Sequence, residues 1–450
     1  MPHHPAGPAH RQCAHQRLAE APGRADHHRA GALSALRGKQ LNPSLAPGLT
    51  QALLLGAVGV TALGQTLVFI LLPSLGRAAG LAEIQVGLII SCSSLAFALA
   101  SPIWGYLSEL RGRRPVLIIG LSGYAVGTLI FGVIFHLGLT GLLAGGALLT
   151  LLVVARMAQA LIMAATPPSA AAYTADITTP EARTRGMARI GAANNLGTVL
   201  GPGVGGMLAA VSLVLPLYLV GALVGLMALA VMFFLPPSPY RGQPADQRVR
   251  AVLATGLRAY GDRRFRDLLV TGVVLFMCLA LIQQTLGFLF QDALNMSPAE
   301  AAGALGTTMM AAAVTSLLGQ LLVVQWLRAP ALVLLAVAVP AIGVGAGLLW
   351  VFDNRVGMTA AVMLVGLGIG FGMPAIMALA SLRVSSEEQG RVAGLASACP
   401  SLGFVLGPLV GTGLYSVDHR FPYMLVVALM VPLGVLVWRL RAKKQEVEGG

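Results

Sequence analysis

Charged residues are scarce in this chain: they make up 10% of its 450 residues, whereas 56% are hydrophobic. A soluble helical protein of this size would need a charged outer face on most of its helices, so the composition excludes that class. The stretches 53–72, 115–135 and 211–235 carry no charge, and each reaches the roughly 18–20 residues that span a hydrocarbon core. The composition therefore predicts an all-α membrane protein.

The sequence also lacks the motifs of several chemical functions. No glycine-rich phosphate-binding loop is present, so ATP is not the expected energy source. The four cysteines have no paired spacing, and we interpret them as packing residues rather than disulfide partners or metal ligands. No basic patch is interleaved with aromatic residues, so the net charge of +13 does not indicate a nucleic-acid partner. Catalytic clusters are missing as well, and we expect no enzyme activity, no cofactor and no metal site.

Apolar segments are abundant instead, and they predict twelve membrane spans. We expect these spans at about 52–74, 85–108, 115–136, 142–166, 187–210, 212–235, 268–290, 301–327, 331–351, 357–381, 391–414 and 421–438. They divide into a six-helix half at 49–235 and a second at 268–440. The segment 236–267 contains a Pro-Pro-Ser-Pro run and seven arginines, and we interpret it as the linker between the halves. A short tail is expected at 441–450.

One glycine-rich element occurs twice within long apolar segments. Residues 197–206 read GTVLGPGVGG, and residues 403–411, which begin 206 positions later, read GFVLGPLVG. The shared positions are Gly197, Gly201, Pro202, Gly205 and Gly206 in the first copy, and Gly403, Gly407, Pro408 and Gly411 in the second. The same offset relates Pro168 to Pro374, Glu181 to Glu387 and Arg185 to Arg391. This repeat predicts two homologous, pseudo-symmetric halves, a plan known for secondary transporters. Glycines four residues apart allow close helix contact, and proline bends a helix.

The basic residues predict how the spans are oriented. If both termini are cytoplasmic, 26 of the 30 Lys and Arg residues face the cytoplasm, that is, all except Arg77, Arg156, Arg355 and Arg420. Cytoplasmic loops of membrane proteins carry such an excess of positive charge. The linker is then cytoplasmic too, and we expect a multi-pass protein of the cell (inner) membrane.

Residues 1–48 differ from the rest of the chain, being polar, basic and rich in Pro, Ala and His. We expect a disordered cytoplasmic tail. Six of the eight histidines lie here, and a His-rich tract can bind metal. The alternatives are a merely solvated tail or an upstream start codon included by mistake. The tail has no apolar core of its own, so it does not resemble a cleaved signal peptide.

The predicted loop between spans two and three reads GYLSELRGRR at residues 105–114. A positively charged turn explains the arginines, but it does not explain a small residue and an acid at fixed distances before them. This loop resembles a signature of the major facilitator superfamily, Gly-x-Leu-x-Asp-Arg-x-Gly-Arg-Arg. The matching positions are Gly105, Leu107, Gly112, Arg113 and Arg114. Glu109 replaces the usual Asp, and Leu110 replaces the usual Arg.

Span four carries a second resemblance, because Arg156-Met-Ala-Gln159-Ala160 is similar to the Arg-x-x-Gln-Gly of that superfamily. Arg156 lies about 14 residues from either end of its apolar region, roughly 20 Å, which is too deep for easy snorkelling. The first Gly-Pro element, residues 197–206, resembles the signature of exporting members. The resemblance spans residues 50–440 and is strongest to the twelve-helix drug:proton antiporter group. It implies the major facilitator fold and export of small organic molecules by proton antiport through alternating access.

Proton antiport requires a group that can be protonated, and candidates are few. Spans one, seven and ten contain no Asp or Glu at mid-depth. Asp292, at the outer end of span seven, is the best candidate, although it is equally an ordinary interfacial acid. We group it with Arg156 and Gln159 as coupling residues of a central cavity. The expected neutral lining of that cavity comprises Gln65, Tyr124, Asn194, Asn195, Gln283 and Gln284.

An ion pair is predicted at the cytoplasmic side, where Arg113 meets Asp176 and Glu109 lies near the inner N-terminus of span eleven. This contact would hold an outward-open state. The expected partners of the chain are a small-molecule substrate, protons and the lipid bilayer, and we expect a monomer. A dedicated exporter of a self-made siderophore or other metabolite is the alternative. An importer of a small organic solute is a further one, against which the Gly-Pro elements count.

Overall fold

The structure is a computed structural model, and it describes residues 47–238, 266–326, 329–382 and 389–449. The chain divides into two units, Met1–Pro47 and Gly48–Gly450, and the second contains the helix bundle. Almost all of the predicted tail (1–48) and linker (236–267) lies outside the described residues. The described part is helical and contains no strand.

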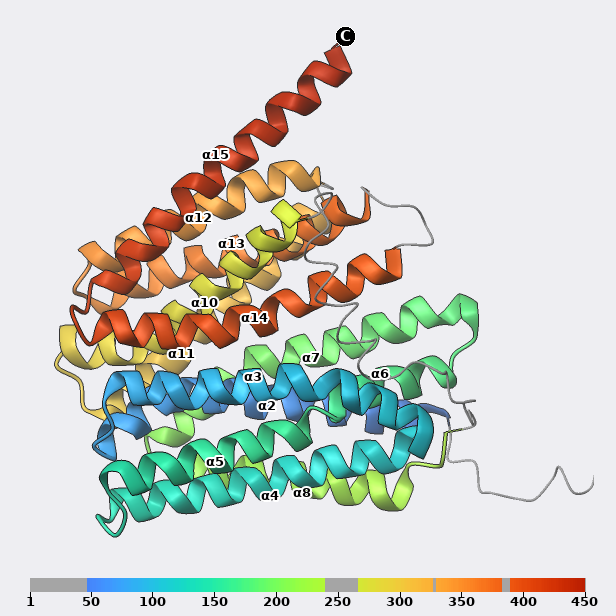
Figure 1. Cartoon of the computed structure of the whole chain (residues 1–450), viewed down its shortest axis with the longest axis vertical. Helices are drawn as coiled ribbons and strands as arrows, with labels where there is room; N and C mark the ends of the chain where they lie inside the picture. The colour runs from blue at the N-terminus through green and yellow to red at the C-terminus, as the bar shows by residue number, and fades with distance from the viewer. Residues whose placement is uncertain (1–46, 239–265, 327–328, 383–388, 450) are drawn as a thin grey trace, which may run out of the picture. The chain divides into compact units, whose positions relative to one another are not determined.

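Within each half the helices follow one another with short connections (Figure 1). The first half comprises α2 (Pro47–Ala78), α3 (Glu83–Arg111), α4 (Arg113–Leu139), α5 (Gly145–Met163), α6 (Thr166–Asp176), α7 (Pro180–Ala209) and α8 (Leu215–Phe234). The second comprises α10 (Arg266–Ala293), α11 (Pro298–Gly319), α12 (Ala331–Val351), α13 (Arg355–Ser381), α14 (Gln389–Tyr415) and α15 (Phe421–Gly449). A π-helical turn, Gln320–Trp326, extends α11. The predicted C-terminal tail (441–450) instead continues α15 as far as Gly449.

Ten helices of the described residues are long and apolar enough to cross a membrane, with α5 and α6 counted as one span, Gly145–Asp176. The predicted fold class, an all-α membrane protein, is therefore confirmed. Helix α7 is not among the ten, and in α14 the apolar stretch Cys399–Tyr415 is shorter than the others. The count of twelve spans stays a prediction for these two helices.

The fourth predicted span, 142–166, ends too early, because the observed span continues to Asp176. Helix α5 stops at Met163, and α6 starts at Thr166 with prolines in its first turn. Proline has no N–H group and is favoured in the first turn of a helix, where that group would have no partner within the helix. Pro167 and Pro168 therefore interrupt the helix without ending the span.

Local sequence fixes where other helices begin. The hydroxyl of Ser297 accepts a hydrogen bond from the Glu300 backbone N–H, and the Glu300 carboxylate accepts one from the Ser297 N–H. This reciprocal pair satisfies donors that lack partners in the first turn of α11. The side chain of Asn354 does the same for the Gly357 N–H at the start of α13.

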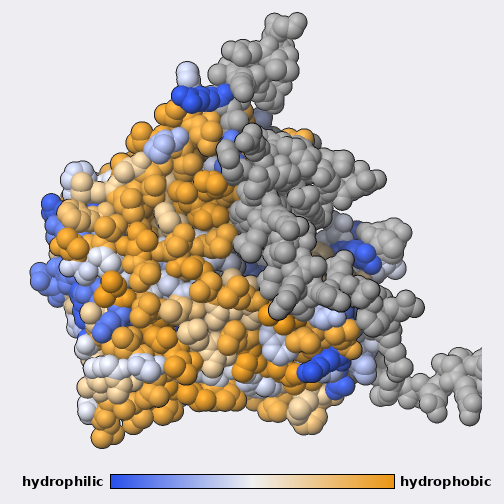
Figure 2. All heavy atoms as spheres, viewed as in Figure 1, coloured by the Kyte–Doolittle hydropathy of each residue, from blue (hydrophilic) through white to orange (hydrophobic). Residues whose placement is uncertain are grey.

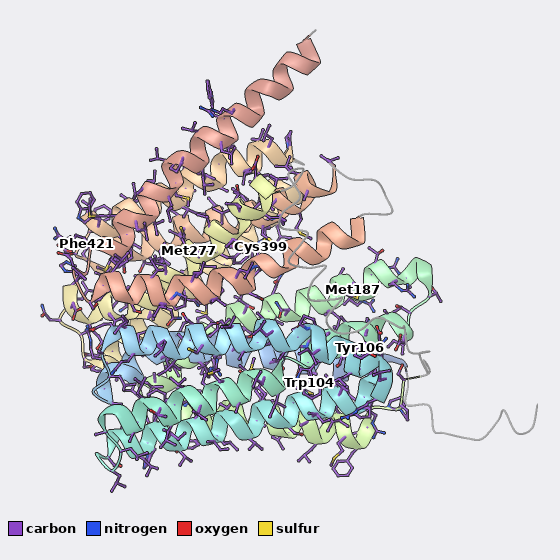
Figure 3. The ribbon with its side chains drawn as sticks, in the orientation of Figure 1. Trp104, Tyr106, Met187, Met277, Cys399 and Phe421 are labelled. Atoms are coloured by element: carbon purple, nitrogen blue, oxygen red, sulfur yellow. The ribbon has the colours of Figure 1, made fainter. Side chains whose placement is uncertain are left out.

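Two ends of the helix bundle are distinguished by their charged residues. We call them the Arg77 end, where Arg77 and Asp292 lie, and the Arg113 end, where Arg113 and Asp176 lie. Figure 3 labels Trp104 and Tyr106 on α3 toward the Arg113 end and Phe421 at the opposite end. The indole N–H of Trp104 donates a hydrogen bond to the Leu161 carbonyl at 2.6 Å, which joins α3 to α5.

The sides of the bundle are apolar. Leu99, Val126, Val154, Leu226 and Phe233 are all more than half exposed. Figure 2 shows a largely hydrophobic face, with hydrophilic residues gathered along the edge formed by the loops of the Arg77 end. Exposed apolar side chains on this scale suit a hydrocarbon environment, in which backbone groups must be satisfied within helices. The chain is a multi-pass membrane protein.

Candidate functional site

The first Gly-Pro element lies on α7 against α2. A methyl group on Gly201 would overlap the Thr66 hydroxyl and lie 2.6 Å from the Leu63 carbonyl oxygen. Gly197 and Gly205 contact α2 one turn before and one turn after. This spacing of four residues forms a continuous seam in which the two helix backbones touch.

The second copy forms the equivalent seam in the other half, between α14 and α10. A methyl group on Gly407 would lie 2.5 Å from the Met277 carbonyl oxygen, and Gly403 and Gly411 meet α10 on either side. The repeat found in the sequence thus corresponds to the same helix contact in both halves.

Each Gly-Pro element also faces the opposite half. On α7, the Pro202 carbonyl oxygen would lie 2.5 Å from a methyl group on Gly306 of α11. On α14, the Pro408 carbonyl oxygen would lie 2.7 Å from one on Gly87 of α3. Gly206 also contacts α11. The sequence interpretation missed Gly87 and Gly306, although glycines in apolar helices are a signal of close contact.

A cavity of about 490 Å³ lies where these helices meet. It is bounded by α2, α3, α5 and α7 of the first half and by α10, α11, α13 and α14 of the second. Its polar lining is largely uncharged and consists of Gln65, Thr66, Ser93, Ser94, Asn194, Asn195, Thr198, Gln283, Ser316, Gln320 and Ser401. Among the described residues that line it, Arg156 is the single charged one. A cavity of this volume and mixed lining suits a small organic molecule.

Four of the six predicted lining residues border the cavity: Gln65, Asn194, Asn195 and Gln283. The other two, Tyr124 and Gln284, are fully buried and do not line this cavity. Gln284 donates to the Phe69 carbonyl at 3.4 Å. Gln284 follows Gln283 on α10, so its side chain points about 100° away, and here it meets the backbone of α2. Tyr124 lies on α4, which packs against α5 and α8 and contributes nothing to the lining.

Arg156 projects from α5 and is 2% exposed. Its Nη1 donates a hydrogen bond to Gln159 Oε1 at 2.5 Å. The Gln159 amide in turn donates to Thr128 Oγ1 at 2.6 Å and to the Tyr124 carbonyl at 3.2 Å. Gln159, which the sequence grouped with Arg156, is buried and does not line the cavity itself. It lies behind Arg156 and orients its guanidinium group.

Aromatic rings near Arg156 were not foreseen from the sequence. The guanidinium carbon lies 5.7 Å from the Phe131 ring centre and 6.0 Å from that of Phe69, within the range of cation–π attraction. Phe69 of α2 stacks on Phe404 of α14 at 5.4 Å, across the boundary between the halves. Both phenylalanines of this stacked pair line the cavity.

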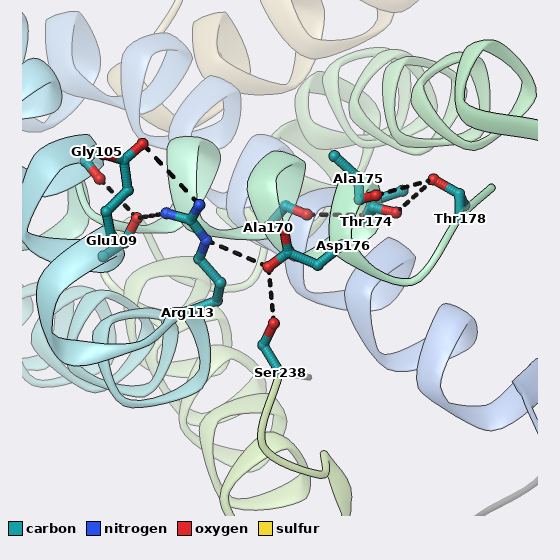
Figure 4. Close-up of polar contacts among 10 residues, drawn as sticks. Gly105, Glu109, Arg113, Ala170, Thr174, Ala175, Asp176, Thr178 and Ser238 are labelled. Atoms are coloured by element: carbon teal, nitrogen blue, oxygen red, sulfur yellow. Dashed lines mark hydrogen bonds and ion pairs between the residues drawn. The ribbon is translucent and has the colours of Figure 1, made fainter. Parts of the chain in front are cut away.

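The residues of the loop signature gather at the Arg113 end (Figure 4). Gly112 has a φ of +93°, a backbone conformation that favours glycine, and it joins α3 directly to α4. This turn orients Arg113, whose Nε lies 3.4 Å from Asp176 Oδ2. Glu109 Oε1 lies 4.0 Å from Arg113 Nη2.

The first residues after α8 join the same cluster. Ser238 donates a hydrogen bond to Asp176 Oδ2 at 2.7 Å, and the Tyr173 hydroxyl donates to the Pro236 carbonyl at 2.7 Å (Figure 4 shows the Ser238 contact). Arg114 donates to the Met232 carbonyl at the end of α8. The first two contacts fix the start of the predicted linker to α6, and the third joins α4 to α8. The inner N-terminus of span eleven, the predicted neighbour of Glu109, has no described side chains.

Asp292 lies at the Arg77 end, near the last residue of α10, which agrees with its predicted position at the end of span seven, and it does not line the cavity. Its carboxylate pairs with Arg77 Nη1 at 2.6 Å and accepts a hydrogen bond from the Tyr415 hydroxyl at 2.6 Å. Arg77 also pairs with Glu83 at 2.6 Å. The four residues form a cluster that ties α2 and α3 to α10 and α14 at the Arg77 end. The sequence around Asp292 could not predict this cluster, because the partners of Asp292 come from helices that are distant along the chain.

Comparison with known proteins places the chain in a family. The Major Facilitator Superfamily profile matches residues 54–399 and 341–449. Multidrug resistance protein 1 of Bacillus subtilis (strain 168) is 25% identical over 406 residues, which cover 88% of this chain and 97% of that protein. Tetracycline resistance protein class G of Vibrio anguillarum is 31% identical over 369 residues, 80% of this chain and 88% of that protein.

A solved structure, the nucleoside transporter NupG, matches with a TM-score of 0.69 and 13% identity over 87% of this chain and 98% of that one. At this identity the likeness concerns the fold alone. The profile match, the full-length relatives and the shared fold agree with one another. The chain belongs to the major facilitator superfamily and is a secondary transporter.

Proposed function

We propose that this transporter exports small organic molecules, drug-like compounds or metabolites, from the cytoplasm in exchange for protons. The cavity bounded by helices of both halves carries this proposal, because a site at that boundary can be exposed to one side or the other as the halves move. The relatives named above are multidrug and tetracycline resistance proteins, which supports export of organic compounds.

The distribution of basic residues supports an orientation with the Arg113 end in the cytoplasm. Both chain termini and the linker are then cytoplasmic, in the inner membrane of the cell. The Arg77 end faces outward in this arrangement. The outer cluster of Arg77, Glu83, Asp292 and Tyr415 therefore closes the release side, and its contacts must separate for substrate to leave.

Asp292 is the proposed proton acceptor. Protonation would remove its charge and weaken its ion pair with Arg77, which lies between the two halves. This couples proton entry from the outside to the opening of that side. Arg156 stays charged at any working pH, so its role is to organise the cavity rather than to carry the proton.

The Arg113–Asp176 pair joins α4 to α6 within one half, so by itself it does not hold the halves together. We propose that it shapes the cytoplasmic turn for a contact with the N-terminus of α14. Glu109 would approach that terminus, where the helix dipole is positive, in the outward-open state.

The test is efflux of tetracycline from proteoliposomes after an inward proton gradient is imposed. We expect gradient-dependent efflux by the wild type, a loss of about tenfold or more in Arg156→Ala, and a smaller loss in Arg156→Lys, which keeps the charge but loses the planar fork of donors. Asp292→Asn should transport without responding to the gradient. Arg189→Gln is the matched control, because Arg189 is exposed and bonds only to Gln51 among the described contacts.

Efflux that ignores the gradient in the wild type would contradict proton coupling. Gradient-driven efflux by Asp292→Asn would assign the proton to another group. Uptake in place of efflux would favour an importer.

A further inference from the structure

We propose that the cavity takes its substrate as a monoanion, whose carboxylate pairs with Arg156 and whose apolar body lies against Phe69 and Phe404. The inference rests on the proposed transport function and names the substrate class of the same cavity. Its basis is the charge balance of the cavity, the unused donors of Arg156 and the aromatic lining.

The described lining of the cavity carries a net positive charge. Arg156 contributes a full positive charge, and no aspartate or glutamate appears among the described residues that line the cavity. Arg156 also has no carboxylate partner among the described ion pairs. A charge that is 2% exposed inside a membrane-spanning helix bundle is costly unless a counter-charge or a set of hydrogen bonds compensates it. A bound anion would supply that counter-charge.

The guanidinium group has donors available for the anion. Arginine carries five N–H donors in a planar fork. One described side-chain bond uses Nη1, toward Gln159, whereas the buried Nε has no hydrogen-bond partner in the described part of the chain. A carboxylate is the group that accepts two parallel N–H bonds from such a fork.

The surroundings hold the fork in position before the ligand arrives. Gln159 is anchored to α4 through Thr128 and the Tyr124 carbonyl, so its oxygen is aimed at Arg156. The rings of Phe131 and Phe69 restrict the guanidinium further. A group that is ordered in advance loses less freedom on binding, which favours affinity.

The rest of the cavity fits an aromatic or aliphatic body. The stacked pair Phe69 and Phe404 joins the two halves, and Phe97, Phe276 and Met309 extend the apolar lining. The amides of Gln65, Asn194 and Gln283 can bond to neutral polar groups on the ligand. A permanent cation would bind poorly, because Arg156 would repel it and no aspartate or glutamate is among the described lining residues to attract it.

The test uses three probes with the same ring system: 2-naphthoate, 2-naphthamide and (2-naphthylmethyl)trimethylammonium. Binding to the full chain in lipid nanodiscs is measured by calorimetry at neutral pH, with empty nanodiscs to correct for partitioning into lipid. We expect naphthoate to bind about tenfold or more tightly than naphthamide, and the ammonium probe not to bind.

Variants identify the charge responsible. Arg156→Gln should remove the preference for naphthoate and leave naphthamide binding within about twofold, whereas Arg156→Lys should keep the preference at reduced strength. Arg189→Gln, an arginine change outside the cavity, should behave as the wild type. If Arg156→Gln does not fold, the binding of the three probes by the wild type still tests the inference.

Equal binding of naphthoate and naphthamide by the wild type, binding of the ammonium probe in preference, or no binding of naphthoate would overturn the inference. Tetracycline efflux in the same preparation separates this outcome from failure of the transport proposal. Efflux with a preference for cations would reject the anion site and keep the exporter.

Discussion

At the residue scale, Arg113 of the loop signature forms a specific ion pair with Asp176. Its side chain is 7% exposed and lies between Ser108, Glu109 and Asp176. Gly112 makes the turn that delivers Arg113 to this position. Because Asp176 is also bonded to Ser238, the pair connects the loop signature to the beginning of the linker.

Arg113→Ala should lower transport by about tenfold or more, which corresponds to ~1.4 kcal/mol, while the protein still reaches the membrane. The reason is that Asp176 would lose its cationic partner in a mostly buried place. Exchanging the two residues, Arg113→Asp with Asp176→Arg, should restore part of the activity. Initial efflux rates normalised to membrane expression provide the measurement. Wild-type rates in Arg113→Ala would remove the pair from the transport cycle.

At the element scale, the Gly-Pro helices α7 and α14 each serve two neighbours. One face of each helix packs within its own half, and the proline carbonyl faces a glycine of the other half. A helix that contacts both halves transmits a shift of one half to the other, since packed helices have few alternative arrangements. The seams are narrow enough to exclude any side chain.

Gly201→Ala should therefore impair the protein, since its methyl group would overlap Thr66 and α2. We expect a cost of about 1–3 kcal/mol, which is typical of overpacking, and a strong loss of transport. Gly191→Ala on the same helix is the matched control, because a methyl group there meets nothing within 4 Å. It should be neutral or stabilise the helix by about 0.5–1 kcal/mol. Thermal unfolding in detergent and efflux assays compare the two. Equal effects of both substitutions would mean that the seam tolerates side chains.

At the scale of the whole molecule, the two halves repeat one architecture, but their charged contacts differ. The first half carries the loop signature at the Arg113 end. The outer cluster at the Arg77 end draws residues from both halves. If the Arg113 end is cytoplasmic, the two ends are controlled by different kinds of contact, one within a half and one between the halves.

This orientation predicts the result of reporter fusions. Fusions after Pro239 and after Gly450 should both report the cytoplasm, because nearly all basic residues lie on their side of the membrane. A fusion after Thr140, in the loop at the Arg77 end, should report the opposite side. An alkaline phosphatase and green fluorescent protein pair provides the measurement. Phosphatase activity of the fusion after Pro239 or after Gly450 would contradict the cytoplasmic placement of that site.

The sequence by itself determined the membrane class, most helix positions and the paired Gly-Pro seams, because apolar length and glycine spacing act locally along one helix. It also identified Arg156 as a charged residue within an apolar span, which requires a polar partner or a cavity. Only the tertiary structure decided that Gln159 supports Arg156 from behind, that Tyr124 and Gln284 are buried away from the cavity, and that Asp292 meets Arg77 and Tyr415. Those outcomes depend on how far each helix is rotated and which distant helix it meets, and both are set by packing between helices rather than by the order of residues within one of them.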